Sequence, residues 1–207
     1  MRKVAATTRL RCLTPARRGR VAAVAVLTAL AGLMAATPAA LADDGPPVCP
    51  DAHVEITQAQ PDQMRAAVLC LINEQRTEHG LPRLAPSTKL DRSAQGWTDS
   101  MVDSDEFTHG AAFMDRISAT GFDWTTVGEN IATGYETPSS VVRAWMNSPG
   151  HCANILDPAY REVGTGVSAR RIPRASTELG TWTQDFGRLM GQPALSANDG
   201  PANACYR

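Results

Sequence analysis

The spacing of apolar residues changes once along this chain, and that change limits the folds it can adopt. Between residues 61 and 146, apolar residues recur at three- and four-residue intervals, which is typical of helices with one buried face. Segments 162–169 and 180–187 instead have the pattern of strands, and the polar loop between them predicts an antiparallel hairpin. Helices followed by strands predict an α+β domain.

Caps and helix-breaking residues set the expected boundaries of the helices. Pro61 suits a first helical turn, and Gly80 is a typical residue just beyond a helix end. Thr137 and Pro138 form a cap and first-turn pair, and the Pro149-Gly150 pair ends that helix. Segment 127–134 is interpreted as a connection to the last helix. The expected helices are 61–79, 87–103, 111–121 and 137–148.

The N-terminal segment predicts export. Residues 1–20 contain seven basic and no acidic side chains, an apolar run covers 21–36, and Ala40-Leu41-Ala42 resembles a signal-peptidase site. The run is shorter than the roughly 20 residues of a membrane-spanning helix. We therefore predict a signal peptide at 1–42 and a secreted, extracellular protein without a stable membrane anchor after cleavage. Arg17-Arg18 leaves both the Sec and the twin-arginine route open.

The charge of the remaining chain argues against nucleic acid as a partner. Without the seven basic residues of its first 20 positions, the chain keeps 13 of its 20 Lys and Arg against 21 Asp and Glu, a net charge of about −8. Such a surface repels phosphate backbones. The expected organisation is an N-terminal arm at 43–60, one compact domain at 61–190 and a C-terminal tail at 191–207.

Four cysteines follow the predicted signal peptide: Cys49, Cys70, Cys152 and Cys205. An even number in an oxidising compartment predicts two disulfides, and we expect them to tie down the arm and the tail. No CxxC pair is present, which argues against a zinc knuckle or a thioredoxin-like site. The residues alone leave all three connectivities open.

Two of the four histidines are candidate functional residues. His53 and His79 are expected to be exposed to solvent. His109 and His151 lie beside glycines, with Glu129 between them in the sequence. If these three side chains converge, they could bind a divalent ion such as zinc or act as a general acid and base. The alternative is three unrelated loop residues.

Other catalytic arrangements find little support. The sequence has no HExxH, no GxSxG and no phosphate-binding glycine loop. A Pro-Gly break separates Ser148 from His151, which disfavours a serine nucleophile. Cys152 directly follows His151, and neighbouring side chains seldom face one another, so a disulfide is favoured over a thiolate.

Five motifs in order carry a resemblance to a known family: CLINEQRTEHGLPRL, FTHG, VGENIATGY, VVRAWMNSPGHCANILDPAYREVGTGV and TWTQDFG. From about Met64 to Gly187, the chain resembles the bacterial branch of the CAP superfamily. Its SCP domain is shared by cysteine-rich secretory proteins, antigen 5 and plant pathogenesis-related 1 proteins. The resemblance implies an α-β-α sandwich with a central antiparallel sheet.

The resemblance also implies a cleft with a His-Glu-Glu-His tetrad, which binds zinc in some members. His109, Glu129 and His151 match three of its positions. The second glutamate is expected three residues after Trp145, where this chain has Ser148. One carboxylate fewer should weaken the binding of zinc or another divalent cation.

The position of the first helix near the cleft wall in this fold suggests a pairing of the cysteines. On that basis we predict Cys70–Cys152, which leaves Cys49–Cys205 to join the two ends of the domain.

Two functions are compatible with these features. The favoured one is an extracellular binding module, expected to be monomeric, whose cleft contains His109, Glu129, His151, Asn130 and Asn154. Its ligand would be a lipid, a glycan or a protein, and the two asparagines are expected to bond loop backbone. The alternative is a divalent-metal-assisted hydrolase in which His109, Glu129 and His151 bind the ion or Glu129 acts as the base.

Overall fold

A computed structural model of the protein describes residues 49–193 and Cys205. The predicted signal peptide at 1–42 lies outside the described residues, as do the first part of the arm and most of the tail. Within the described part of the chain, no helix combines the length and apolar character needed to cross a membrane.

The described chain contains the predicted helices and hairpin. Helices are α1 (Pro61–Glu78), α2 (Thr88–Ser104), α3 (Phe113–Ala119), α4 (Pro138–Met146) and α5 (Pro149–Ile155). Strands are β1 (Ala85–Pro86), β2 (Trp124–Thr133), β3 (Glu162–Ser168) and β4 (Thr181–Leu189). The boundary signals were informative: Thr137 caps α4, and its side chain accepts a hydrogen bond from the Ser140 amide.

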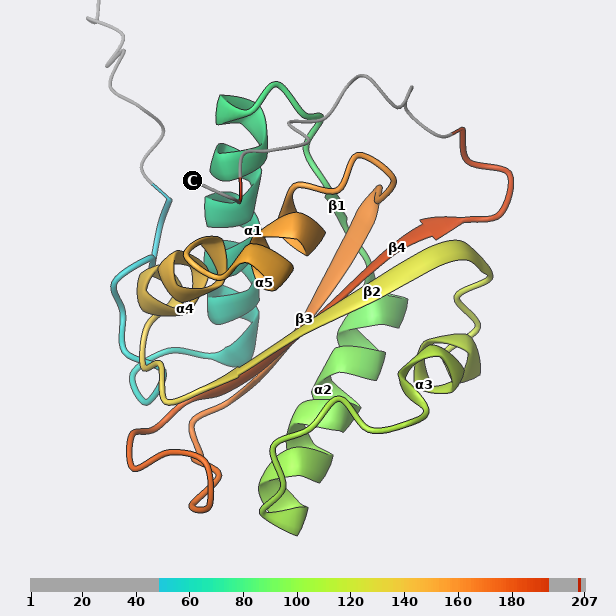
Figure 1. Cartoon of the computed structure of the whole chain (residues 1–207). Coiled ribbons are helices and arrows are strands. Elements are labelled where there is room, and N and C mark those ends of the chain that lie inside the picture. Colours follow the sequence, from blue (N-terminus) through green and yellow to red (C-terminus); the bar gives the residue numbers. More distant parts are fainter. Residues whose placement is uncertain (1–48, 194–204, 206–207) are drawn as a thin grey trace, which may run out of the picture. The chain divides into compact units, whose positions relative to one another are not determined.

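The strands form one sheet between two layers of helices. Their order is β1-β3-β4-β2, with β3–β4 and β2–β4 antiparallel and a two-residue parallel pairing of β1 with β3. Helices α1, α4 and α5 cover one face, and α2 and α3 cover the other (Figure 1). This is the predicted α-β-α sandwich, and β2 lies at one edge of it.

Strand β2 corrects the sequence interpretation. Segment 127–134, which we interpreted as a connection, belongs almost entirely to this ten-residue strand. Gly128, Glu129 and Asn130 are all buried in it, although such residues are depleted in strands. Tertiary context overrides that local preference, because β2 pairs with β4 along its whole length and places Glu129 opposite Asp185.

Two glycines let α2 approach the sheet closely. A Cβ atom at Gly164 would clash with the backbone around Leu90, and one at Gly166 would clash with the Ala94 carbonyl. The absence of side chains at these two positions of β3 brings the helix backbone against the strand. Side chains of α2 therefore reach buried polar groups of β4, and the Thr98 hydroxyl bonds the Thr183 hydroxyl at 2.9 Å.

The predicted disulfide pairing is wrong. The chain pairs Cys49 with Cys70 and Cys152 with Cys205, at Cα–Cα distances of 5.6 and 5.7 Å. The arm before α1 lies beside that helix, so Cys49 reaches Cys70. Cys152 lies on α5 and is 1% exposed, and it is bonded to Cys205 from the tail. The prediction of two disulfides is confirmed, although neither bond joins the two ends of the domain.

Candidate binding cleft

Glu129 is the centre of a buried ion pair on β2. Its side chain is 2% exposed, and each carboxylate oxygen has a different partner. His109, in the loop between α2 and α3, places Nδ1 2.8 Å from Oε1. Arg116 of α3 donates to Oε2 at 2.6 Å. Two of the three predicted tetrad residues therefore meet, together with an arginine that we did not predict.

Packing fixes the positions of Arg116 and the His109 loop. The Arg116 guanidinium lies 3.8 Å from the centroid of the Trp97 ring, at a distance typical of cation–π stacking. Trp97 also donates its indole N–H to the Thr108 carbonyl, next to His109. Gly110 has a φ of +64°, and a Cβ there would press on the Trp97 ring. One aromatic side chain thus supports both partners of Glu129.

Asp185 is a second buried carboxyl group beside Glu129. It lies opposite Glu129 on β4 and is 1% exposed. Among the described residues, neither of its oxygens has a hydrogen-bond partner. Burial, and then the charge of Glu129, raise the pKa of Asp185 well above its usual range. Burial also raises the pKa of Glu129, and the charge of Arg116 opposes that effect, so the positive charge beside this pair of carboxyl groups comes from Arg116.

The pKa of both histidines of the site is lowered. Burial and the positive charge of Arg116 lower the pKa of His109. Burial and the proximity of His109 lower the pKa of His151. A neutral His109 donates its Nδ1–H to Glu129, which leaves a lone pair on Nε2.

The other face of β2 carries a network of amides instead of charges. Asn130 donates to the backbone carbonyl of His151 at 3.2 Å and to Gln184 Oε1 at 3.3 Å. Asn154 of α5 donates to the Glu129 carbonyl at 3.1 Å and to Asn130 Oδ1 at 2.8 Å. Both asparagines bond backbone, as expected, and together they fasten α5 to β2.

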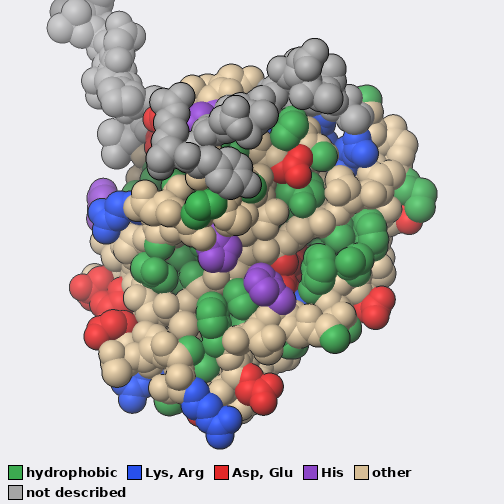
Figure 2. All heavy atoms as spheres, in the orientation of Figure 1, with side chains coloured by type: hydrophobic (Ala, Val, Ile, Leu, Met, Phe, Trp, Pro, Cys, Tyr) green, Lys and Arg blue, Asp and Glu red, His purple; other side chains and the backbone are tan. Residues whose placement is uncertain are grey.

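A pocket of about 310 Å³ opens between β2 and α4. His151 and Ser148 contribute polar atoms to it, while most of the other lining side chains are apolar. Figure 2 shows two histidine side chains close together on this face, with hydrophobic side chains on either side. The lining residues are Phe107, Ile131, Ala132, Thr133, Tyr135, Ala144, Trp145, Ser148, His151 and Ala175.

The predicted site residues thus fall into two groups. His109 and Glu129 form the ion-pair group on the α2/α3 side of β2. His151 lies on α5, not in a loop, and lines the pocket. Ser148, at the position expected for a glutamate, is the N-cap residue of α5 and lines the same pocket.

Sequence reasoning missed Arg116 and Asp185. Arg116 lies on a seven-residue helix, where an arginine ordinarily faces solvent. Asp185 offered a clearer signal, since a charged residue in the middle of a buried strand demands a partner. Neither residue could be assigned to Glu129 without knowledge of the sheet register.

The residues present do not fit a zinc ion. Zinc sites in proteins use three or four ligands. Both Glu129 oxygens have protein partners, Ser148 supplies no carboxylate, and only the two imidazoles remain. Across the described ranges, the group of three ligand atoms lying within 4.8 Å of one another is Cys49, Cys70 and Glu74, and its two sulfurs form a disulfide.

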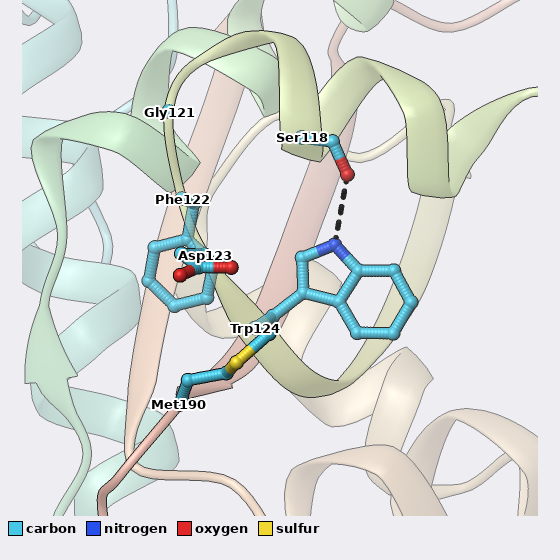
Figure 3. A pocket seen from close by; sticks show the side chains of 6 residues that line it. All are labelled: Ser118, Gly121, Phe122, Asp123, Trp124 and Met190. Atoms are coloured by element: carbon cyan, nitrogen blue, oxygen red, sulfur yellow. Dashed lines mark hydrogen bonds between the residues drawn. The ribbon is translucent and has the colours of Figure 1, made fainter.

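A second pocket, of about 350 Å³, lies between the end of α3 and the start of β2. Figure 3 shows Trp124 held by a hydrogen bond from its indole N–H to the Ser118 hydroxyl, and Met190 lines the same pocket. None of the predicted site residues lines this pocket, so it is separate from the candidate cleft.

Comparison with known proteins agrees with this architecture. The model of the cysteine-rich secretory protein family, CAP, matches residues 69–186. The chain is 38% identical over 125 residues to the uncharacterized protein YkwD of Bacillus subtilis and 31% identical over 107 residues to the uncharacterized membrane protein YlbC of that organism. These matches cover 58% and 50% of this chain, and 45% and 31% of the relatives. The chain therefore spans less than half the length of the curated relatives it matches.

Solved structures give the same result. An extracellular protein containing an SCP domain from Bacillus anthracis is 26% identical, with a TM-score of 0.53, over 63% of this chain and 44% of that one. An outer surface protein from Borrelia burgdorferi shares the fold at 22% identity and a TM-score of 0.52, over 59% and 90% of the two chains. The chain belongs to the CAP family, and these relatives are bacterial.

Proposed function

We propose that this CAP domain is an extracellular binding module whose ligand enters the pocket between β2 and α4. The observation that carries the proposal is the pocket itself, which combines an apolar lining with the polar groups of His151 and Ser148. Ligand sites commonly have this composition, with a few polar groups that fix orientation.

The size of the pocket limits what it can hold. Its volume of about 310 Å³ is at the lower end of the range for small-molecule sites. It suits a single ring or a short alkyl segment of a larger lipid, glycan or protein ligand. Because Trp145 and Phe107 line the pocket, stacking against a flat or aliphatic group would contribute to binding.

The geometry favours binding over the metal-assisted hydrolase. Glu129, which would hold the ion or act as the base, is bonded to His109 and Arg116 through both oxygens. The hydrogen bonds of the described residues include none between the Ser148 hydroxyl and the His151 ring, so no base activates that serine. Turnover of p-nitrophenyl butyrate that disappears with EDTA would favour the hydrolase instead.

Export is part of the same proposal. The basic and apolar N-terminal segment, the two disulfides and an extracellular relative support it. N-terminal sequencing of the chain from culture medium should give Asp43 as the first residue. Recovery of the intact chain from membranes would contradict cleavage after Ala42.

Ligand binding can be tested through Trp145. We expect either dodecanoate, as a lipid probe, or N,N′-diacetylchitobiose, as a glycan probe, to change the tryptophan fluorescence of the protein. Ala144→Phe should fill the pocket and weaken binding at least about tenfold, a loss of about 1.4 kcal/mol. Ala153→Phe, at an exposed position of α5, is the matched control. Absence of any response to both probes, or equal affinity in Ala144→Phe, would contradict the assignment of the pocket.

A further inference from the structure

The ion pair of Glu129 has a consequence for metal binding that is independent of the pocket. A carboxylate that is 2% exposed must be neutralised by a positive charge. Here the positive charge comes from Arg116, whose side chain is 19% exposed. The guanidinium lies 2.6 Å from Oε2 of Glu129, at contact distance for a charge-assisted hydrogen bond.

We propose that Arg116 is the built-in cation of this site and keeps divalent metal ions away from Glu129. Its guanidinium occupies the carboxylate oxygen that an ion would need, and the charge on it repels a second cation. The two disagreements with a zinc tetrad, Ser148 and the occupied carboxylate, then have one explanation. The protein needs no second glutamate because it has no ion to neutralise.

Packing around Arg116 holds its side chain in this position. The guanidinium rests on Trp97 at 3.8 Å, and Trp97 in turn holds the backbone of the His109 loop. Strand β2 presents Glu129 to the face of the sheet that α3 covers, since Arg116 of α3 bonds its carboxylate. Loss of Arg116 would free one carboxylate oxygen of Glu129 beside His109, and His109 is near enough to His151 to lower its pKa. A carboxylate and two imidazoles are a ligand set that zinc accepts if they converge.

The proposal predicts that metal binding can be created by removing one charge. Zn²⁺ titrated into the wild-type protein should give no heat of binding at Zn²⁺ concentrations up to about 100 μM. Arg116→Met keeps an apolar contact with Trp97 and frees the carboxylate. This variant should bind Zn²⁺ with a Kd of about 1 μM, and Zn²⁺ should raise its melting temperature.

Two variants separate charge from shape. Arg116→Lys retains a cation and should remain unable to bind Zn²⁺. Arg116→Gln removes the charge but keeps a hydrogen-bond donor, and it replaces Arg116→Met as the test if the latter does not fold. Adding His109→Ala to the zinc-binding variant should abolish the new site. Co²⁺ in place of Zn²⁺ should give visible absorption bands only in the variants without the charge.

Clear results would overturn the proposal. Wild-type protein that binds Zn²⁺ and loses this binding in His109→Ala would show that Arg116 does not exclude the ion. Folded Arg116→Met and Arg116→Gln that both fail to bind would show that the other ligands cannot converge. Neither result bears on the pocket, because its probes and its Ala144→Phe variant do not involve the ion pair.

Discussion

The two faces of β2 contain buried polar groups, and they satisfy them in different ways. On the face toward α2 and α3, Glu129 is charged and depends on Arg116 and His109. On the face toward α5, Asn130 is neutral and its amide partners are Asn154 and Gln184. A charged group needs an opposite charge when it is buried, whereas an amide needs only donors and acceptors. Glu129 and Asn130, which are adjacent in β2, therefore need different kinds of partner.

The charged face should be the more sensitive one. Arg116→Met leaves the Glu129 carboxylate buried without its counter-charge, and we expect it to lower the free energy of unfolding by about 3 kcal/mol. Urea denaturation in EDTA measures this effect. Arg170→Met removes the exposed ion pair with Asp103 and should cost less than about 1 kcal/mol. Equal effects in the two variants would remove the distinction between a buried and an exposed pair.

The amide face should respond next. Asn130→Ala leaves the His151 carbonyl and Gln184 Oε1 without their donor and removes one of the two acceptors of the Asn154 amide, at a cost of about 2 kcal/mol. Asn147→Ala, at an exposed position after α4, should change stability by less than about 0.5 kcal/mol. Comparison of their urea midpoints checks the prediction. If Asn130→Ala lowers the free energy of unfolding more than Arg116→Met does, the amide face is the more sensitive of the two.

Asp185 offers a finer test, because burial raises the pKa of its carboxyl group well above the usual range. If it is protonated in the folded protein, Asp185→Asn replaces one neutral group with another of the same shape and removes the cost of protonating a carboxyl group that is ionised in the unfolded chain. The free energy of unfolding at pH 7, measured by urea denaturation, should therefore rise. A loss of about 3 kcal/mol would instead mean that Asp185 is ionised and shares the charge of Arg116.

The smallest expected effect is a dependence of stability on pH. The pKa values of His109 and His151 lie below that of an unfolded histidine, so the unfolded chain binds more protons as the pH falls below about 6.5. These two residues therefore stabilise the fold at neutral pH, and this contribution is lost at acid pH. Asp185, whose pKa is raised, acts in the opposite direction, since its folded form gains a proton first.

The two opposing contributions can be separated in one variant. In the Asp185→Asn background, the urea midpoint should fall between pH 7.5 and 5.5 more steeply than in the wild type, because the opposing carboxyl group is gone. Replacing both histidines with glutamine in that background should flatten the dependence. A midpoint that rises toward pH 5.5 in Asp185→Asn would contradict the lowered histidine pKa values.

The sequence by itself determined the fold class, helices α1 to α4, the β3–β4 hairpin and the family. These depend on local spacing and on ordered motifs, such as the apolar face of α1 and the Thr137 cap of α4, which the chain carries within a few residues. The number of disulfides followed from the even cysteine count. His109 and Glu129 were also predictable as a pair, because the family motifs carry both of them.

Only the tertiary structure decided the disulfide pairing, the strand at 124–133 and the partners of Glu129. Each depends on residues that are distant in sequence: Cys152 with Cys205, Glu129 with Asp185, and Glu129 with Arg116. A charged residue in a buried segment indicates that a partner is needed, but it does not identify the residue that supplies it. Sheet register and helix packing make that choice, and here they place Arg116 against the Glu129 carboxylate.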